Sequence, residues 1–214
     1  MIVYGSSLSP YVRKVLAFAA EKGIDVESRP VGIGDQDPEF REASPFGKMP
    51  GFRDGDFAIS DSTAIVTYLE ALRPEPVLIP AEPRARARTI WFDEFSDTIM
   101  MACGGKMFFN RVVAPRFLRR EGDLAAADKA EQEELPPILD YLERVIPDSG
   151  FLVEDRLTLA DIAIASPFAN FRHMRVECME GRPKLAAYVE AILSRPSFAP
   201  CIAREAAFLE RTAA

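Results

Sequence analysis

The sequence predicts an α/β domain followed by an all-α domain. Two observations support this prediction. Residues 1–80 contain short apolar segments separated by glycine and proline turns, whereas the residues beyond them show apolar side chains at helical spacing. The segment Pro74–Pro83 carries four prolines in ten residues, and such a stretch cannot continue a helix. We therefore expect a first domain at 1–75, a linker at 76–84 and a helical domain at 85–214.

The first domain is expected to have the element order β-α-β-α-β-β-α. The apolar run Ile2–Tyr4 predicts the first strand. Apolar residues between Pro10 and Lys22 recur at helical spacing, and Gly23 follows as a helix terminator. The dipeptide Asp54-Gly55 favours the tight turn of a hairpin. The remaining elements are an extended stretch at 26–31, one or two helical turns at 38–43, hairpin strands within 51–59 and a helix at 62–72.

The second domain is expected to be helical throughout. Its first helix runs from Pro83 to about Val113, with an interruption or kink near Gly104-Gly105. Thr158 and Asp161 form a capping box, which is a folding signal without chemistry of its own. The other expected helices cover 123–146, bent by a Pro-Pro pair, 158–171, 183–194 and a short segment after residue 197.

Composition excludes entire classes of function. Acidic residues outnumber basic ones 33 to 26, whereas nucleic-acid binders usually show a basic stripe. No apolar stretch approaches the roughly 20 residues that cross a bilayer, and the N-terminus has no signal-peptide pattern. The three cysteines form no CxxC pair, which argues against a disulfide framework or a zinc site. We expect a cytoplasmic protein without nucleic-acid, membrane or metal partners.

The segment Ser9-Pro10-Tyr11 lies where the first strand gives way to the first helix. Serine followed by proline is a common way to start a helix, so Ser9 fits a simple capping role. The same geometry lets its hydroxyl donate a hydrogen bond to an anion, which the helix dipole also favours. An external thiol held at such a helix end ionises more readily. The residues alone favour the capping role, and the second interpretation stays open beside it.

Two further pairs carry candidate chemistry. Met49-Pro50 precedes the hairpin, either as the trans start of an edge strand, which the residues alone favour, or as a cis bond that leaves the Met49 backbone free to pair with an extended ligand. Asp61-Ser62 opens a helix, where it fits either capping or a clamp for an amino acid. In the clamp, Asp61 takes an α-ammonium and Ser62 an α-carboxylate. Lys48 fits a solvated surface charge.

The order and spacing of these motifs resemble those of cytosolic glutathione transferases over the whole chain. Ser9-Pro10-Tyr11 is similar to the opening motif of the tau and omega classes. The loop Ser44–Pro50 resembles the segment that leads to the family's cis-proline. Asp61-Ser62 occupies the place of the family's acid-serine pair, and Thr158–Asp161 matches its helix-capping box. The resemblance identifies a serine-type member of bacterial kind.

This resemblance implies a thioredoxin-like domain joined to a helical bundle, with glutathione as co-substrate and no metal. It implies that Ser9 stabilises the glutathione thiolate and that Met49, followed by a cis Pro50, pairs with the cysteinyl portion. Ser6 and Ser7 are alternatives for the hydroxyl, and Tyr4 is a weaker one. The γ-glutamyl end would be held by Asp61 and Ser62, and Lys48 would face a glutathione carboxylate.

The resemblance places the second substrate against the helical domain. The candidate residues of this pocket are Tyr11, Met101, Gly104, Met107 and Phe108. A stripe of methionine and aromatic side chains fits a core equally well. Phe168 and Phe171 fit core packing better, and His173 is interpreted as structural or exposed. Without a histidine near Ser9, a Ser-His-Asp hydrolase is untenable.

The expected activity is that of a homodimeric glutathione S-transferase acting on a small apolar electrophile. Two alternatives remain. One is a non-catalytic interaction or ligand-carrier module of the same architecture. The other is a glutathione-dependent lyase, dehalogenase or isomerase. The absence of cysteine from residues 1–75 counts against thiol transfer by a protein cysteine.

Overall fold

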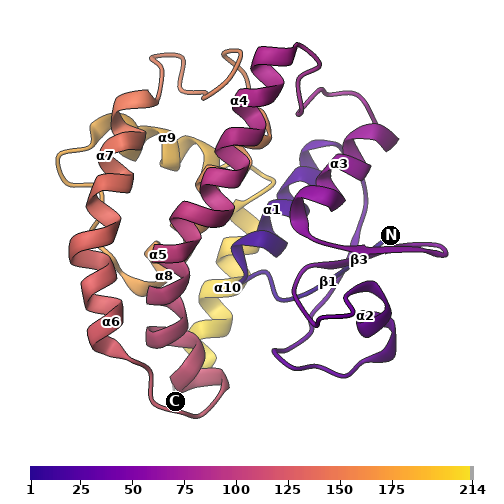
Figure 1. Cartoon of the computed structure of the whole chain (residues 1–214), viewed down its shortest axis with the longest axis horizontal. Coiled ribbons are helices and arrows are strands. Elements are labelled where there is room, and N and C mark those ends of the chain that lie inside the picture. Colours follow the sequence, from indigo (N-terminus) through magenta and orange to yellow (C-terminus); the bar gives the residue numbers. More distant parts are fainter. Residues whose placement is uncertain (213–214) are drawn as a thin grey trace.

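The computed structural model describes residues 1–212 and contains a sheet-bearing part and a helical part (Figure 1). The strands form one sheet in the order β2-β1-β3-β4, in which only β1 and β2 are parallel. Three helices complete the predicted β-α-β-α-β-β-α order, so the predicted fold class is confirmed. The elements are β1 (Ile2–Tyr4), α1 (Pro10–Glu21), β2 (Glu27–Arg29), α2 (Pro38–Ala43), β3 (Gly51–Asp54), β4 (Phe57–Ser60) and α3 (Ser62–Leu72).

The hairpin turn differs by one residue from the prediction. Asp54 is still paired with Phe57, so the two-residue loop is Gly55-Asp56 rather than Asp54-Gly55. Gly55 supplies the positive φ of 61° that the tight turn requires. The Asp54 carboxylate instead accepts the Tyr68 hydroxyl at 2.8 Å, which joins the end of β3 to α3.

The first helix of the helical part is continuous through the glycine pair, contrary to the prediction. It comprises α4 (Pro83–Glu94), the π-helical segment η1 (Phe95–Met100), α5 (Met101–Phe108) and the π-helical segment η2 (Phe109–Phe117). Gly104 and Gly105 lie within α5. A Cβ on Gly104 would lie 2.9 Å from the Phe171 ring, so this glycine serves close packing. The irregular segments are the two π-helical ones, where side chains of the site are placed.

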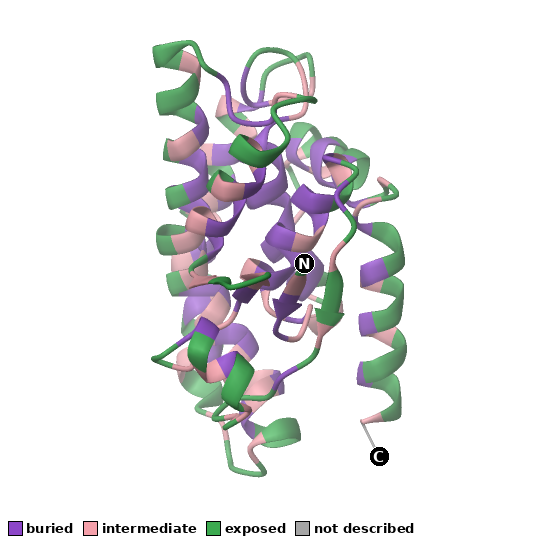
Figure 2. Cartoon of the chain, turned by 90° about the vertical axis from the view of Figure 1, so that its right-hand side faces the viewer, coloured by how far each residue is buried: buried purple, intermediate pink, exposed green. Residues whose placement is uncertain are grey.

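The remaining helices include α8, whose residues 159–171 are all buried and whose last turn is partly exposed. They are α6 (Leu124–Lys129), η3 (Ala130–Glu134), α7 (Leu135–Val145), α8 (Leu159–Met174), α9 (Pro183–Leu193) and α10 (Ala199–Arg211). The predicted capping box is present, and Asp161 Oδ2 accepts the Thr158 N–H at 2.8 Å. The last helix has 13 residues and is not the short segment expected. It buries one face and exposes the other (Figure 2).

Two neighbouring cations of α1 fasten the sheet-bearing part to the helical part. Lys14 lies 2.7 Å from Asp93 and 2.6 Å from Asp97, and both lysine and Asp93 are fully buried. Arg13 binds the Glu205 carboxylate of α10 through Nε and Nη2. Buried charges persist only when they are paired in this way. No helix within residues 1–212 combines the length and hydropathy that a membrane crossing demands.

Candidate functional site

A cavity of about 720 Å³ opens between the two parts of the chain. Its volume falls within the range of small-molecule sites. One side comes from the loop between β1 and α1, the loop between β2 and α2, and Met49. The other side comes from α5, η2, α8 and α10, and its surface is mainly apolar.

Ser9 is the N-cap residue of α1 and lines this cavity. Its φ of −75° and ψ of 123° are extended, and Pro10 occupies the first helical position. Its side chain makes no capping hydrogen bond. The backbone N–H of Ser9 donates to the Ser6 carbonyl at 2.9 Å, which closes the turn ahead of the helix. The hydroxyl therefore stands at a helix N-terminus without a local partner that competes for it.

The three alternatives to Ser9 as the hydroxyl donor lie in different places relative to the cavity. Ser6 also lines the cavity, and its Oγ accepts the Leu8 N–H at 3.4 Å. Ser7 is not part of the lining and lies beside the Cys201 thiol of α10. Tyr4 is fully buried, and its hydroxyl donates to Glu39 at 3.0 Å. Of these four residues, Ser6 and Ser9 line the cavity, and Ser9 is the one that occupies a helix N-cap position.

The Met49-Pro50 peptide bond is cis, as the resemblance implies, and Met49 lines the cavity. Lys48 and Pro50 lie outside the lining. The backbone N–H and carbonyl of Lys48 both bind the Ser44 hydroxyl, at 3.0 and 2.7 Å. Its ammonium group is exposed and forms no ion pair within residues 1–212.

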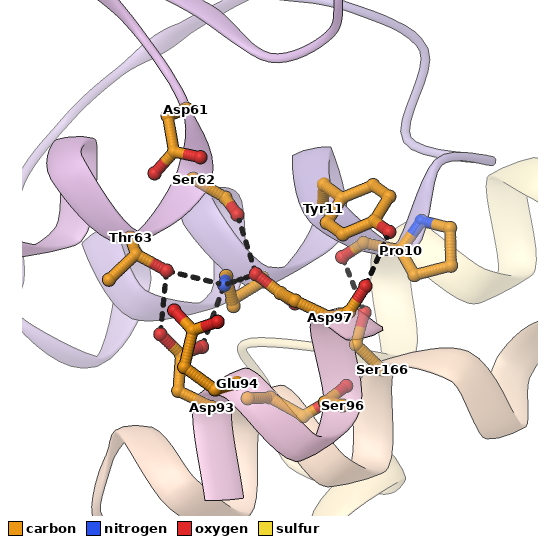
Figure 3. A network of polar contacts seen from close by, with 12 residues as sticks. Pro10, Tyr11, Asp61, Ser62, Thr63, Asp93, Glu94, Ser96, Asp97 and Ser166 are labelled. Atoms are coloured by element: carbon orange, nitrogen blue, oxygen red, sulfur yellow. Dashed lines mark hydrogen bonds and ion pairs between the residues drawn. The ribbon is translucent and has the colours of Figure 1, made fainter. Parts of the chain in front are cut away.

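Asp61 and Ser62 lie next to one another at the start of α3, also outside the lining (Figure 3). Asp61 is exposed and has a φ of 82°, a conformation that is costly for a residue with a side chain. Its carboxylate caps α3 by accepting the Ala64 N–H at 2.9 Å. Strained backbone of this kind concentrates at ligand-binding sites.

Asp97 of η1 joins this pair to the cavity, and the sequence did not single it out. Its Oδ2 accepts the Ser62 hydroxyl at 3.2 Å, and its backbone carbonyl accepts the Tyr11 hydroxyl at 3.0 Å (Figure 3). Burial raises the pKa of Asp97, as does the charge of Asp93, whereas Lys14 lowers it. The Ser62 proton is therefore already engaged within the chain.

Tyr11 reaches from α1 into the cavity lining. Burial raises the pKa of its hydroxyl to about 12, and the negative charges of Asp97 and Asp61 act in the same direction. The hydroxyl consequently stays protonated at neutral pH and remains bonded to the Asp97 carbonyl.

On the helical side, the structure brings together three of the predicted pocket residues and excludes one. Met101, Gly104 and Phe108 line the cavity. Met107 is fully buried and is not part of the lining, so its prediction as a pocket residue is wrong. The reason is helical phase: Met107 is one turn beyond Cys103, whose thiol lies 3.9 Å from the methionine sulfur and faces η3.

Sequence reasoning missed five aromatic and polar residues of the same side, one of which is Phe109 of η2. Phe117 of η2 and Phe208 of α10 have nearly parallel rings whose centroids are 6.0 Å apart. Phe171 and Asn170 of α8 also line the cavity, although core packing was expected for Phe171. Phe168, its neighbour on α8, is fully buried as expected. These residues come from helices far apart in the chain, and no local motif marks them.

The comparisons with known proteins all indicate the same family. Models of the glutathione S-transferase N-terminal and C-terminal domains match residues 3–77 and 101–196. The chain is 31% identical to a glutathione S-transferase of Hyoscyamus muticus, over 94% of this chain and 97% of that one. It is also 31% identical to glutathione S-transferase 3 of Zea mays, over 94% and 92%. A solved glutathione S-transferase from Rhodospirillum rubrum F11 superposes with a TM-score of 0.86 at 25% identity, covering 94% and 90% of the two chains.

Proposed function

The chain belongs to the glutathione S-transferase family and is a glutathione transferase, and from this premise we propose that Ser9 stabilises the thiolate of bound glutathione. The thiolate then attacks a small apolar electrophile in the adjoining cavity. The observation that supports this proposal concerns Ser9, which is the N-cap residue of a helix of 12 residues and lines the cavity, and whose hydroxyl makes no capping hydrogen bond.

The free energy that Ser9 must supply to stabilise the thiolate is small. Lowering the thiol pKa by one unit requires about 1.4 kcal/mol of preference for the thiolate. A hydroxyl donor together with a helix N-terminus supplies roughly one or two such units. The remaining acceleration comes from holding the thiolate and the electrophile in one cavity. The sulfur forms a bond to the electrophilic carbon, and the bond from that carbon to its leaving group breaks, so that the leaving group departs with the electron pair. The thiol proton has left to solvent before this step.

The positions of the other candidate residues suggest which group binds each remaining part of glutathione. The Met49 backbone pairs with the cysteinyl portion, and Asp61 binds the α-ammonium of the γ-glutamyl end. Because the Ser62 hydroxyl donates to Asp97, the α-carboxylate is bound by backbone N–H groups at the start of α3 rather than by that hydroxyl. The Lys48 ammonium, which has no carboxylate partner within residues 1–212, faces a glutathione carboxylate.

The electrophile lies against Met101, Gly104 and Phe108, with Tyr11 at the junction of the two substrates. The surroundings are mostly apolar, so this side contributes shape and exclusion of water. The reaction needs no metal. We further propose that the protein is a serine-type enzyme of bacterial kind. It acts as a homodimer in the cytoplasm.

The test measures turnover of glutathione with an activated aryl halide. Ser9→Ala is expected to lower kcat/KM at neutral pH by about 10–100-fold, which corresponds to one or two pKa units. Ser7→Ala is the matched control, because Ser7 lies in the same loop but outside the cavity lining, and it should leave kcat/KM unchanged.

Other outcomes would change the assignment. Unchanged turnover in Ser9→Ala together with a loss in Ser6→Ala would move the role to Ser6. Glutathione binding without turnover of any electrophile would indicate a carrier or interaction module.

A further inference from the structure

Both carbonyl groups that flank Ser9 are hydrogen-bonded to α8. The Asn170 side chain donates from Nδ2 to the Leu8 carbonyl at 2.9 Å. The Ser166 hydroxyl donates to the Pro10 carbonyl at 2.8 Å. Asn170 and Ser166 are both buried, one turn apart on the same helix face. The short segment that carries Ser9 is therefore held from the helical part of the chain, on either side of the residue.

Arg13 determines which way the Asn170 amide faces. Its Nη1 donates to Asn170 Oδ1 at 2.9 Å and to the Ser166 carbonyl at 2.7 Å. A guanidinium group has donors only, so the amide oxygen must face Arg13, and the amide nitrogen is left to donate to Leu8. The opposite orientation would place nitrogen against a guanidinium and oxygen against a carbonyl.

Glu205 of α10 in turn holds Arg13. Its two carboxylate oxygens accept from Nε at 3.1 Å and from Nη2 at 2.7 Å, a bidentate geometry. Burial acts to raise the pKa of Glu205, but bonds from His173 and Arg13 lower it overall, so the carboxylate is ionised at neutral pH. A continuous series of buried bonds thus connects α10 to the backbone beside Ser9.

We propose that Asn170 and Ser166 are positioning residues that fix the place of the Ser9 hydroxyl against the bound thiol. This proposal rests on the role of Ser9 proposed above. Ser9 makes no capping hydrogen bond of its own, so the backbone at Leu8 and Pro10 determines where its hydroxyl lies. Small displacements of a stabilising group are enough to weaken catalysis.

A matched pair of serine variants tests the proposal. Ser166→Ala removes the bond to the Pro10 carbonyl. Ser96→Ala removes a bond of the same kind, because the buried Ser96 hydroxyl donates to the Ala163 carbonyl at 2.8 Å, away from Ser9. Each variant loses one buried hydrogen bond that joins α8 to another segment, so the two should lose thermal stability to a similar degree. The pKa of bound glutathione, read from ultraviolet thiolate absorbance, separates them.

Ser166→Ala is expected to raise this pKa by about half a unit to one unit, a three- to tenfold loss of thiolate below the pKa. Ser96→Ala should leave it unchanged. Asn170→Asp provides a second test, because aspartate still accepts from Arg13 but cannot donate to Leu8 when ionised. It should raise the pKa at least as much as Ser166→Ala. Equal pKa values in wild type, Ser166→Ala and Asn170→Asp would overturn the proposal.

The double variant Ser9→Ala/Ser166→Ala separates this proposal from the one on which it rests. If Ser166 acts through Ser9, removing it in the Ser9→Ala background changes the thiol pKa no further. An additive increase would contradict positioning through Ser9. If Ser9→Ala alone leaves the pKa unchanged, the proposed function fails first. If only Ser9→Ala raises it, the function stands and the positioning role fails.

Discussion

The two sides of the cavity are built by different physical means. The strand side (Ser6, Ser9 and Met49) is positioned by backbone geometry: a helix N-cap, a tight turn and a cis peptide. The helical side is formed by packed side chains from α5, η2, α8 and α10. Hydrogen-bond donors must meet direction as well as distance, whereas an apolar surface needs mainly volume and shape.

The two sides therefore tolerate different substitutions. On the strand side, a change of one polar group removes a directed interaction with the peptide. On the helical side, an exchange of one apolar residue reshapes the cavity and leaves the hydroxyl of Ser9 in place. Variants of the strand side should therefore alter glutathione kinetics, and variants of the apolar residues on the helical side should alter those of the electrophile alone.

Asp61→Asn gives the largest expected effect among the variants that test this division. Asparagine keeps the cap on α3 but loses the charge that binds the α-ammonium. The KM for glutathione should rise about tenfold, as for a lost bond to a charged group, with little change in the KM for the electrophile. Asp123→Asn is the matched control, since Asp123 caps α6 through Ala126 at the same 2.9 Å. Equal effects of the two variants on the KM for glutathione would contradict a contact between Asp61 and the α-ammonium.

Gly104→Ala is expected to have an intermediate effect confined to the electrophile. The added Cβ would lie 2.9 Å from the Phe171 ring, so the ring must move within the cavity. Overpacking of this kind costs about 1–3 kcal/mol of stability, and the KM for a bulky electrophile should change several-fold. Gly105→Ala meets only the flexible end of Met101 at 3.2 Å and should change it less. A shift in the KM for glutathione would contradict the division of the site.

Phe208→Leu should have the smallest effect. This ring is 40% exposed and stacks against Phe117 at the edge of the cavity, so leucine removes the aromatic contact but keeps an apolar surface. A change of about twofold in kcat/KM is expected, for aromatic electrophiles only, because the weakest such ring pairs contribute about 0.5 kcal/mol, which corresponds to that factor. Equal effects on aliphatic and aromatic electrophiles would count against direct ring contact.

The strand side was largely predictable from the sequence because its determinants are local. The Ser-Pro helix start, the Met-Pro pair and the Asp-Ser helix start each lie within a few adjacent residues. The hairpin turn was misplaced by one residue because Asp54 still pairs with Phe57 at the end of its strand. A glycine next to a polar residue indicates a turn but not which of two adjacent registers it takes.

For the helical side, the sequence predicted the kinds of residue that line the cavity but not which of them meet there. Phe117, Phe171 and Phe208 meet through tertiary packing of helices that are distant in sequence, and no spacing rule connects them. Met107 was misassigned because a methionine stripe fits core and cavity alike until the rotation of the helix is known. Two π-helical segments, η1 and η2, also change that rotation. The sequence does contain a usable signal in α8, because Ser166 and Asn170 are polar residues within the otherwise apolar run 162–171.

The role of Ser9 is best tested by the ultraviolet absorbance of thiolate in bound glutathione, titrated against pH for the wild type and Ser9→Ala. Tyr11, with its pKa raised to about 12, stays protonated through the neutral range and does not confuse the titration. We expect the wild-type thiol pKa to lie about one or two units below that of free glutathione, and Ser9→Ala to return it most of the way. Saturating glutathione with an unshifted pKa in the wild type, or an equal shift in both proteins, would contradict the assignment of Ser9.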